Sequence, residues 1–79
     1  MDIGEPRLPR VTAEEALRAL MRDGWFVSRQ SGSHAVLCYS AKPGRVVVPR
    51  HQRKTLKLAT LSAILAQAGL TAEQFERLL

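Results

Sequence analysis

A chain of 79 residues can bury one hydrophobic core and offers little material for a second, so we expect a single domain. Hydrophobic residues make up 46% and charged residues 24% of the sequence, a balance that excludes a wholly disordered chain. The net charge is +5, and no acidic residue occurs between positions 24 and 72. Such a cationic region attracts polyanions, most often nucleic acid, although a basic surface that only aids solubility is the alternative.

The single cysteine, Cys38, has no partner for an internal disulfide, and no secretory signal pattern opens the chain. We therefore expect a cytoplasmic protein. No apolar stretch approaches the ~20 residues needed to cross a bilayer, which favours a soluble one. Because Cys38 lies in an apolar run, we interpret it as a small buried residue rather than a nucleophile.

Residues 1–10 carry two prolines and a glycine without periodicity, so we interpret them as an irregular leader before a single domain at 11–79. Thr12 and Glu15 have the spacing of a capping box, which predicts that a helix begins here. Gly24 is expected to end this helix. Its apolar stripe is expected to contain Ala16, Leu17, Leu20 and Met21.

Three runs rich in β-branched and aromatic residues follow, and each predicts a strand: 25–30, 34–39 and 45–48. The segments between them are short and rich in turn-forming residues, so neighbouring strands are expected to pair antiparallel. The second of these segments, 40–44, contains Lys-Pro-Gly and is the clearer turn. Pro49 is expected to end the third strand, because proline cannot donate a hydrogen bond to a sheet. Trp25 is interpreted as a core residue, with stacking on a base as the alternative.

A second helix is predicted from apolar residues at spacings of three and four: Leu58, Leu61, Ile64 and Leu65. Gly69 supplies a left-handed stop, and Thr71 with Gln74 forms a second capping box for a short terminal helix. The apolar residues expected to dock this last helix are Phe75, Leu78 and Leu79. The predicted fold class is α+β, a three-stranded antiparallel sheet with helices on one face. The opposite face is then left for function.

Chemistry without a cofactor falls to the two histidines, His34 and His51, because the sequence shows no metal-binding cluster and no phosphate-binding glycine loop. His34 directly follows a Ser-Gly-Ser turn, where a strand end presents its side chain to a ligand. Arg29 ends the preceding strand and is expected nearby, whereas Arg45 is expected at the opposite end of the sheet. An imidazole can take the proton of a ribose 2′-hydroxyl, and an arginine can stabilise the phosphate. The alternative for His34 is a strand-end histidine hydrogen-bonded to backbone.

A series of short motifs runs through most of the chain in a fixed order: Gly24-Trp25, Arg29-Gln30, Gly32-Ser33-His34, Gly44-Arg45-Val46, Val48-Pro49, His51, Thr60-Leu61, Ile64-Leu65, Gln67-Ala68-Gly69-Leu70 and Phe75. In this order they resemble the HicA toxin family, and the resemblance covers roughly residues 12–76. Gly-Ser-His alone is a weak signal. Its combination with the motifs before and after it is specific.

This resemblance implies a double-stranded-RNA-binding-like fold, α-β-β-β-α with a short C-terminal helix, and ribonuclease activity toward messenger RNA without a metal or cofactor. It also implies a cognate antitoxin, HicB, that shields the site. His34 matches the catalytic histidine of the family. Two residues depart from the family pattern: Cys38 stands where a basic residue is common, and Ala59 where a glycine often precedes the Thr-Leu pair. The first bears on one phosphate contact, and the second on where the second helix begins.

The basic connector, residues 50–57, precedes the second helix. In the related fold, lysines at this place straddle phosphates across a groove, so Arg53, Lys54 and Lys57 are expected to position RNA. The backbone amide of Ser33 is a further candidate for a phosphate contact. A solvated basic loop, or a docking patch for an acidic antitoxin surface, are the alternatives for the connector. We interpret His51 as a turn or packing residue rather than a second catalyst.

Three functions remain distinguishable from the residues. The first is a toxin endoribonuclease in which His34 moves a proton and Arg29 is the nearest electrostatic helper. The second is a non-catalytic RNA-binding module of the same fold, which would bind RNA in a salt-dependent way without arresting growth. The third is a protein-interaction module, whose basic surface would be explained by its partner.

Overall fold

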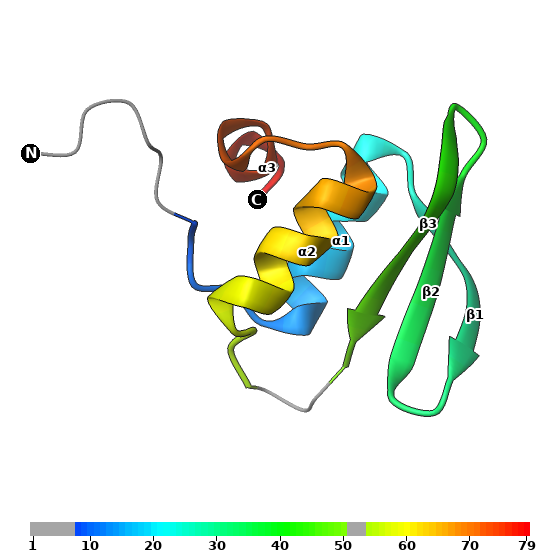
Figure 1. Ribbon diagram of the computed structural model, residues 1–79, viewed down its shortest axis with the longest axis horizontal. Helices are drawn as coiled ribbons and strands as arrows, with labels where there is room; N and C mark the ends of the chain where they lie inside the picture. The colour runs from blue at the N-terminus through cyan, green and yellow to red at the C-terminus, as the bar shows by residue number, and fades with distance from the viewer. Residues whose placement is uncertain (1–7, 51–53) are drawn as a thin grey trace, which may run out of the picture.

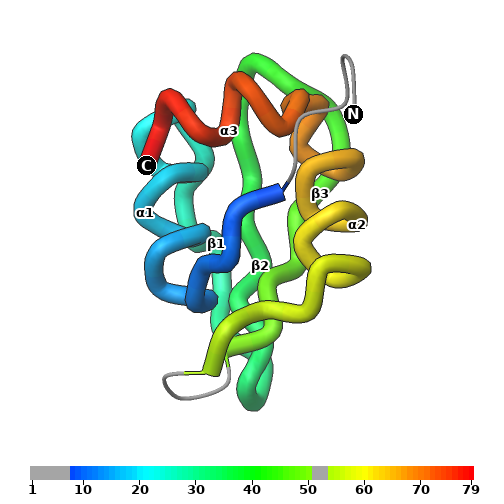
Figure 2. The backbone as a smooth tube through the Cα atoms, turned by 90° about the vertical axis from the view of Figure 1, so that its left-hand side faces the viewer, coloured from blue at the N-terminus to red at the C-terminus, as the bar shows by residue number. Residues whose placement is uncertain are grey.

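A computed structural model describes residues 8–50 and 54–79, in which the chain forms three helices and one three-stranded antiparallel sheet (Figure 1). In chain order the elements are α1 (Ala13–Asp23), β1 (Phe26–Ser31), β2 (His34–Tyr39), β3 (Lys42–Pro49), α2 (Leu58–Ala68) and α3 (Ala72–Leu78). The strands lie in the order β1-β2-β3, and α1 and α2 both cover one face of the sheet (Figures 1 and 2). The predicted α+β class and its α-β-β-β-α order are confirmed.

The two capping boxes form as their sequence spacing predicts. At α1, Thr12 Oγ1 accepts from the Glu15 N–H at 3.2 Å, and Glu15 Oε1 accepts from the Thr12 N–H at 2.8 Å. The hydrogen bond from the Thr12 backbone, followed by that from its hydroxyl, holds the pKa of the Glu15 carboxyl below its usual value. At α3, Thr71 and Gln74 make the same reciprocal pair with a neutral side chain. Each box satisfies amides that a helix start otherwise leaves unpaired.

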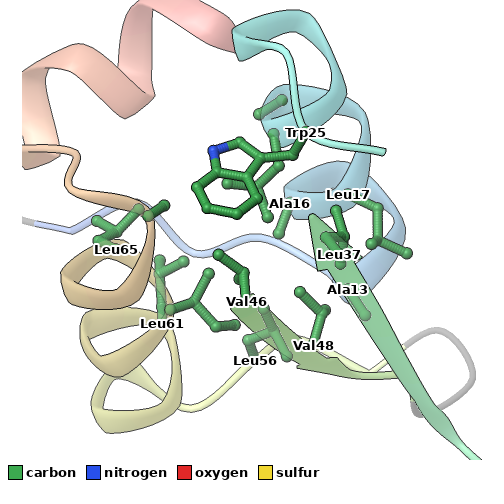
Figure 3. Packing of buried hydrophobic residues seen from close by; sticks show 14 of the residues in the cluster. Ala13, Ala16, Leu17, Trp25, Leu37, Val46, Val48, Leu56, Leu61 and Leu65 are labelled. Atoms are coloured by element: carbon green, nitrogen blue, oxygen red, sulfur yellow. The ribbon is translucent and has the colours of Figure 1, made fainter. Parts of the chain in front are cut away.

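The hydrophobic core lies between the helices and the inner face of the sheet (Figure 3). The strands contribute alternate residues to it, since the fully buried positions of β2 and β3 are Ala35, Leu37, Val46 and Val48. Trp25 is buried, as predicted, and its Nε1–H donates to Asp23 Oδ2 at 3.2 Å. It precedes β1 instead of belonging to it.

Two apolar residues expected in the core are exposed. Met21 is 53% exposed. The buried face of α1 contains Ala16, Leu17 and Leu20, as predicted, together with Ala13 and Ala19. Leu79 is 48% exposed, whereas Phe75 is buried and Leu78 packs against the core. The buried stripe of α1 therefore includes Ala19 and leaves Met21 on the exposed side of the helix.

The second turn of the sheet is the element that sequence reasoning placed wrongly. β2 has the predicted bounds, but β3 begins earlier than predicted and runs over Lys42–Pro49. The turn therefore contains only residues 40–41, and the residues on either side of it, Tyr39 and Lys42, pair with each other. The Pro-Gly pair lies inside β3, where the register shifts and Gly44 has φ +83°. Proline and glycine therefore form a bulge in an edge strand here, a place where both are tolerated.

The segment before α2 is joined to the segment before α1. The Leu56 N–H donates to the Val11 carbonyl at 2.7 Å, and Thr55 forms a bridge with Thr12. Leu56 and Val11 are both buried. Leu8, within the expected leader, also packs against the core. The part of the basic connector at 54–57 is thus fixed in position, not a free loop. Within the described residues, no helix has the length and apolar character that a bilayer crossing requires.

Candidate functional site

His34 is the first residue of β2 and directly follows the two-residue turn Gly32-Ser33. In the sheet it pairs with Ser31 on one side and Pro49 on the other. Because the next residue, Ala35, points into the core, His34 lies on the outer face, away from the helices, and it is exposed. Its ring has no hydrogen-bond partner among residues 8–50 and 54–79, so the imidazole is open to a ligand from the outer face.

Arg29 shares the outer face with His34. It pairs with Val36, and paired residues of antiparallel strands project to the same side of a sheet. His34 and Val36 lie on one strand two residues apart, so Arg29 is a diagonal neighbour of His34 at about 7–8 Å between Cα atoms. A register shift between Val27 and Arg29 makes this possible, because it turns Arg29 outward. Arg45 is exposed in the middle of β3, not at the start of the strand as predicted, because β3 begins at Lys42.

A cavity of about 360 Å³ adjoins the same end of the sheet. Its lining is Pro49, Lys54, Thr55, Leu56, Lys57 and Thr60. Since Pro49 is also the β3 partner of His34, the cavity begins next to the strand pair that carries the histidine. Lys54 and Lys57 are exposed and flank the buried Leu56, whose burial fixes the backbone between them.

The start of α2 contributes further to this cavity. Lys57 is the N-cap residue, and it forms no side-chain capping bond within the described residues. The first amides of α2 are therefore left for a ligand or for water, and they add the positive end of the helix dipole to the two lysine charges. An anion is the ligand class that this arrangement favours.

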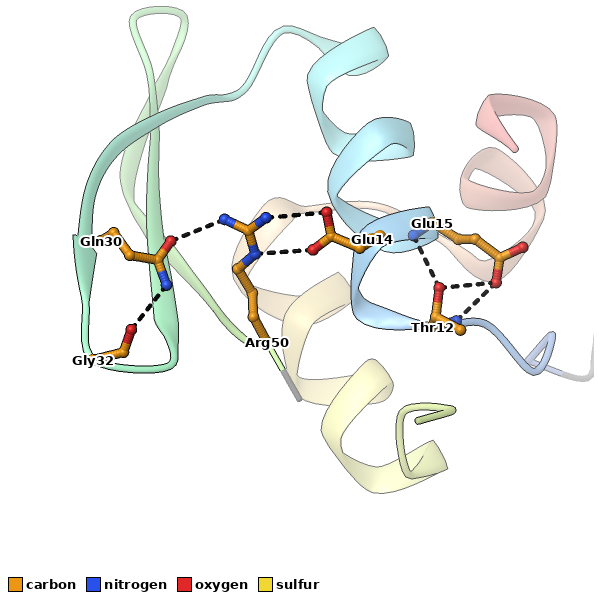
Figure 4. A network of polar contacts seen from close by, with 6 residues as sticks. All are labelled: Thr12, Glu14, Glu15, Gln30, Gly32 and Arg50. Atoms are coloured by element: carbon orange, nitrogen blue, oxygen red, sulfur yellow. Dashed lines mark hydrogen bonds and ion pairs between the residues drawn. The ribbon is translucent and has the colours of Figure 1, made fainter. Parts of the chain in front are cut away.

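Arg50 is the residue that sequence reasoning missed. It was grouped with the basic connector, but its guanidinium is held by Glu14 of α1 and Gln30 of β1 (Figure 4). Glu14 lies far away in sequence, yet the fold returns this carboxylate to the cationic region. The only sequence signal was an acidic residue facing out of the first turn of α1, which by itself indicates nothing about its partner.

Four further residues were singled out in the sequence: Arg53, His51, Ser33 and Cys38. Arg53 and His51 lie outside the described residues. Ser33 is exposed in the turn, and its carbonyl accepts from the Arg50 N–H. Cys38, expected to be buried, is only half-buried on the outer face opposite Phe26. Among the residues that the structure describes, no three His, Cys, Asp or Glu side chains gather in a way that could hold a metal ion.

These features define a small α+β protein with an exposed strand-end histidine, an arginine beside it and a lysine-lined cavity at the start of α2. A sequence model for a protein family matches residues 13–70, which include all of these groups. The family is described as the HicA toxin of bacterial toxin-antitoxin. The chain belongs to the HicA toxin family. It is therefore the toxin of a toxin–antitoxin pair and has an antitoxin partner. A comparison with curated proteins finds no match.

Proposed function

We propose that this toxin is a metal-independent endoribonuclease that cleaves messenger RNA and so inhibits translation, with His34 as its catalytic residue. The observation that supports this most strongly is the exposed imidazole of His34 on the outer sheet face, beside Arg29 and next to the cavity of Lys54 and Lys57. A proton-transfer group and one cation are thus available on the outer face, and further cations for the phosphates lie around the adjoining end of the sheet.

The reaction needs one proton taken and one given. In our proposal the imidazole of His34 removes the proton from a ribose 2′-hydroxyl, and the 2′-oxygen attacks the adjacent phosphorus. The bond from phosphorus to the 5′-oxygen breaks, and that oxygen leaves with a proton from the imidazolium or from water. The products are a 2′,3′-cyclic phosphate and a 5′-hydroxyl end. Proton transfer of this kind contributes about 100- to 10,000-fold to a rate.

The cations have two tasks in this proposal. Arg29, the diagonal neighbour of His34, stabilises the charge that develops on the phosphate during cleavage. Lys54, Lys57 and Arg53 bind phosphates farther along the strand, and the Ser33 amide is a further contact. Because Leu56 fixes the backbone between Lys54 and Lys57, the positions from which the two side chains extend are set before RNA arrives.

The experiment is cleavage of messenger RNA by purified protein in the presence of EDTA, with the products analysed for cyclic phosphate ends. Wild type is expected to cleave. His34→Ala is expected to lose at least about 100-fold in rate while folding normally, because the residue is exposed. Arg29→Ala should lower kcat, and Arg45→Ala, which removes the same charge from the middle of β3, is the matched control. Intact RNA with folded wild-type protein contradicts the proposal.

A second candidate is a non-catalytic RNA-binding module of the same fold. The fixed lysine cavity at the start of α2 supports it, because phosphate binding there needs no chemistry at His34. This module would bind RNA with a steep salt dependence and would leave it intact. His34→Ala separates the two candidates, because only the nuclease loses an activity on this change.

We further propose that the antitoxin is of the HicB type and shields His34 by covering the outer face of the sheet. Phe26 and Val47 are 52% and 38% exposed, and both lie on this face by their pairing with Cys38 and Val36. An acidic partner with apolar residues fits such a surface. Competition between RNA and the antitoxin for the toxin tests this, and simultaneous binding of both contradicts it.

A further inference from the structure

Arg50 directly follows β3 and connects it to α1 and β1 around the end of the sheet that carries His34. Its Nε and Nη2 donate to the two carboxylate oxygens of Glu14 at 2.9 and 3.0 Å, and its Nη1 donates to Gln30 Oε1 at 3.0 Å (Figure 4). All three distances are those of good hydrogen bonds. The planar guanidinium therefore holds the first turn of α1 and the end of β1 in one fixed relation.

The same residue also controls the turn before His34. Gln30 Nε2 donates to the Gly32 carbonyl at 3.1 Å, and the backbone N–H of Arg50 donates to the Ser33 carbonyl. Both residues of the turn are thus held through Arg50, one by its main chain and the other through Gln30. Apart from its chain neighbours, no described atom lies within 4 Å of a Cβ built on Gly32, so the turn is held by the pairing of Ser31 with His34 and by these polar contacts, not by packing.

We propose that Arg50 is a positioning residue that fixes the turn and thereby sets the direction of the His34 imidazole, with Glu14 and Gln30 holding its guanidinium. This inference rests on the proposed nuclease function. The side chains of Arg50 and Glu14 are 38% and 54% exposed, so the ion pair contributes little to stability. Its effect is on geometry, to which catalysis is far more sensitive, since a displacement of about 1 Å at a reacting group can cost about 100-fold in rate.

Glu14→Gln gives a test in which two explanations predict changes in different quantities, RNA affinity and kcat. Simple electrostatics predicts tighter RNA binding, because the change removes a negative charge beside a cationic surface. Positioning predicts a lower kcat, because the amide can accept only one of the two guanidinium bonds. We expect kcat for RNA cleavage to fall about 5- to 10-fold, which is within the sensitivity of catalysis to orientation, with KM unchanged or lower. Glu76→Gln removes the same charge from α3, at the other end of the molecule, and is expected to leave kcat unchanged (Figure 1).

A second variant removes the link to the turn and keeps the link to Arg50. In Gln30→Glu the carboxylate still accepts from Arg50 Nη1 but cannot donate to the Gly32 carbonyl. We expect the melting temperature to be maintained and kcat to fall. Gln74→Glu adds the same charge within the capping box of α3, where the side-chain oxygen remains an acceptor, and serves as the control. An unchanged kcat in both Glu14→Gln and Gln30→Glu overturns the proposal.

Backbone amide NMR signals of residues 31–34 provide a readout that does not depend on cleavage. If wild type fails to cut RNA, the nuclease proposal fails, and the role of Arg50 is then judged by these signals alone. Shifts confined to the turn and faster amide exchange in both variants support it. Unchanged turn signals, or a loss of melting temperature that alone explains the lower activity, overturn it.

Discussion

Each end of β3 is joined to the helical layer by one long cationic side chain, but the surroundings of the two residues differ. At the start of the strand, Lys42 Nζ donates to Asp23 Oδ2 at 3.3 Å and to the Ala68 carbonyl at 2.8 Å, and lies 5.9 Å from the centre of the Tyr39 ring. Beyond the other end, Arg50 binds Glu14 and Gln30. Lys42 thus connects the last residues of α1 and α2 next to packed aromatic rings, whereas Arg50 holds an exposed turn.

The packing around the two residues explains their different roles. Near Lys42, Trp25 and Tyr39 meet edge to face with ring centres 5.6 Å apart, so this end is fixed by the core. Near Arg50, His34 and the turn before it are exposed. A site that admits RNA, as we propose for this one, cannot be buried, so its geometry is set by hydrogen bonds instead. We infer that the Lys42 end serves stability and the Arg50 end serves function.

Two glycines give the largest expected difference between the ends. Gly24 has φ +123°, and a Cβ there would lie 2.4 Å from the Tyr39 ring. Gly24→Ala combines backbone strain with overpacking and should lower the free energy of unfolding by about 3 kcal/mol. Gly32→Ala has φ +59° but free space among the described atoms, so it should cost about 1 kcal/mol. Urea denaturation measures both, and equal losses would contradict the contrast.

Lys42→Met should have the next largest effect on the free energy of unfolding. It removes a charged hydrogen bond to the Ala68 carbonyl and a partly exposed ion pair, with a loss of about 1 kcal/mol in unfolding free energy. Cleavage of RNA at a temperature where the variant is folded should not change, because Lys42 lies at the opposite end of β3 from Pro49, the partner of His34. A lowered kcat in the folded variant would show that the division between the two ends is wrong.

Lys54→Ala and Lys57→Ala sharpen the functional side of the comparison. Each should weaken RNA binding uniformly across sequences and reduce the slope of log affinity against log salt by about 0.7, the value for one phosphate contact on a single strand. Fluorescence titration at several salt concentrations measures the slope. The double variant should lose about twice as much. A slope identical to wild type would remove these lysines from the RNA surface.

The capping boxes give the smallest expected effect. Because the folded pKa of Glu15 is lowered from its ordinary value of 4.5, its contribution to stability is complete above that pH and disappears as the pH falls through the lower folded value. Glu15→Gln keeps the acceptor and should remove this acid dependence. The Gln74 box of α3 is already neutral and provides the internal comparison. Acid titration of the melting temperature would show the difference.

Local signals in the sequence located much of this architecture. The capping boxes at Thr12 and Thr71, the stop at Gly69 and the bounds of β2 depend on residues a few positions apart, and all are as predicted. The place of His34 after a tight turn follows from the same kind of signal. Short-range spacing is sufficient here because each of these features depends on residues that lie close together in the sequence.

Features that depend on distant partners were not predictable in this way. The Pro-Gly pair in β3 was interpreted as part of a turn, and only the pairing of Tyr39 with Lys42 shows that it forms a bulge. The contact between Arg50 and Glu14 joins residues 36 positions apart and leaves no local pattern. The cavity at the start of α2 is a further example. Its lysines were predicted, but its backbone is fixed by a hydrogen bond to Val11, which lies far away in the sequence.

The most direct test of the central claim compares wild type with His34→Ala in growing bacteria that lack the antitoxin. Wild type should arrest growth with rapid loss of full-length messenger RNA. His34→Ala, at the same protein level, should permit growth, and the purified variant should keep the salt-dependent RNA binding of wild type. If His34→Ala arrests growth and degrades messenger RNA as wild type does, the assignment of catalysis to this histidine is wrong.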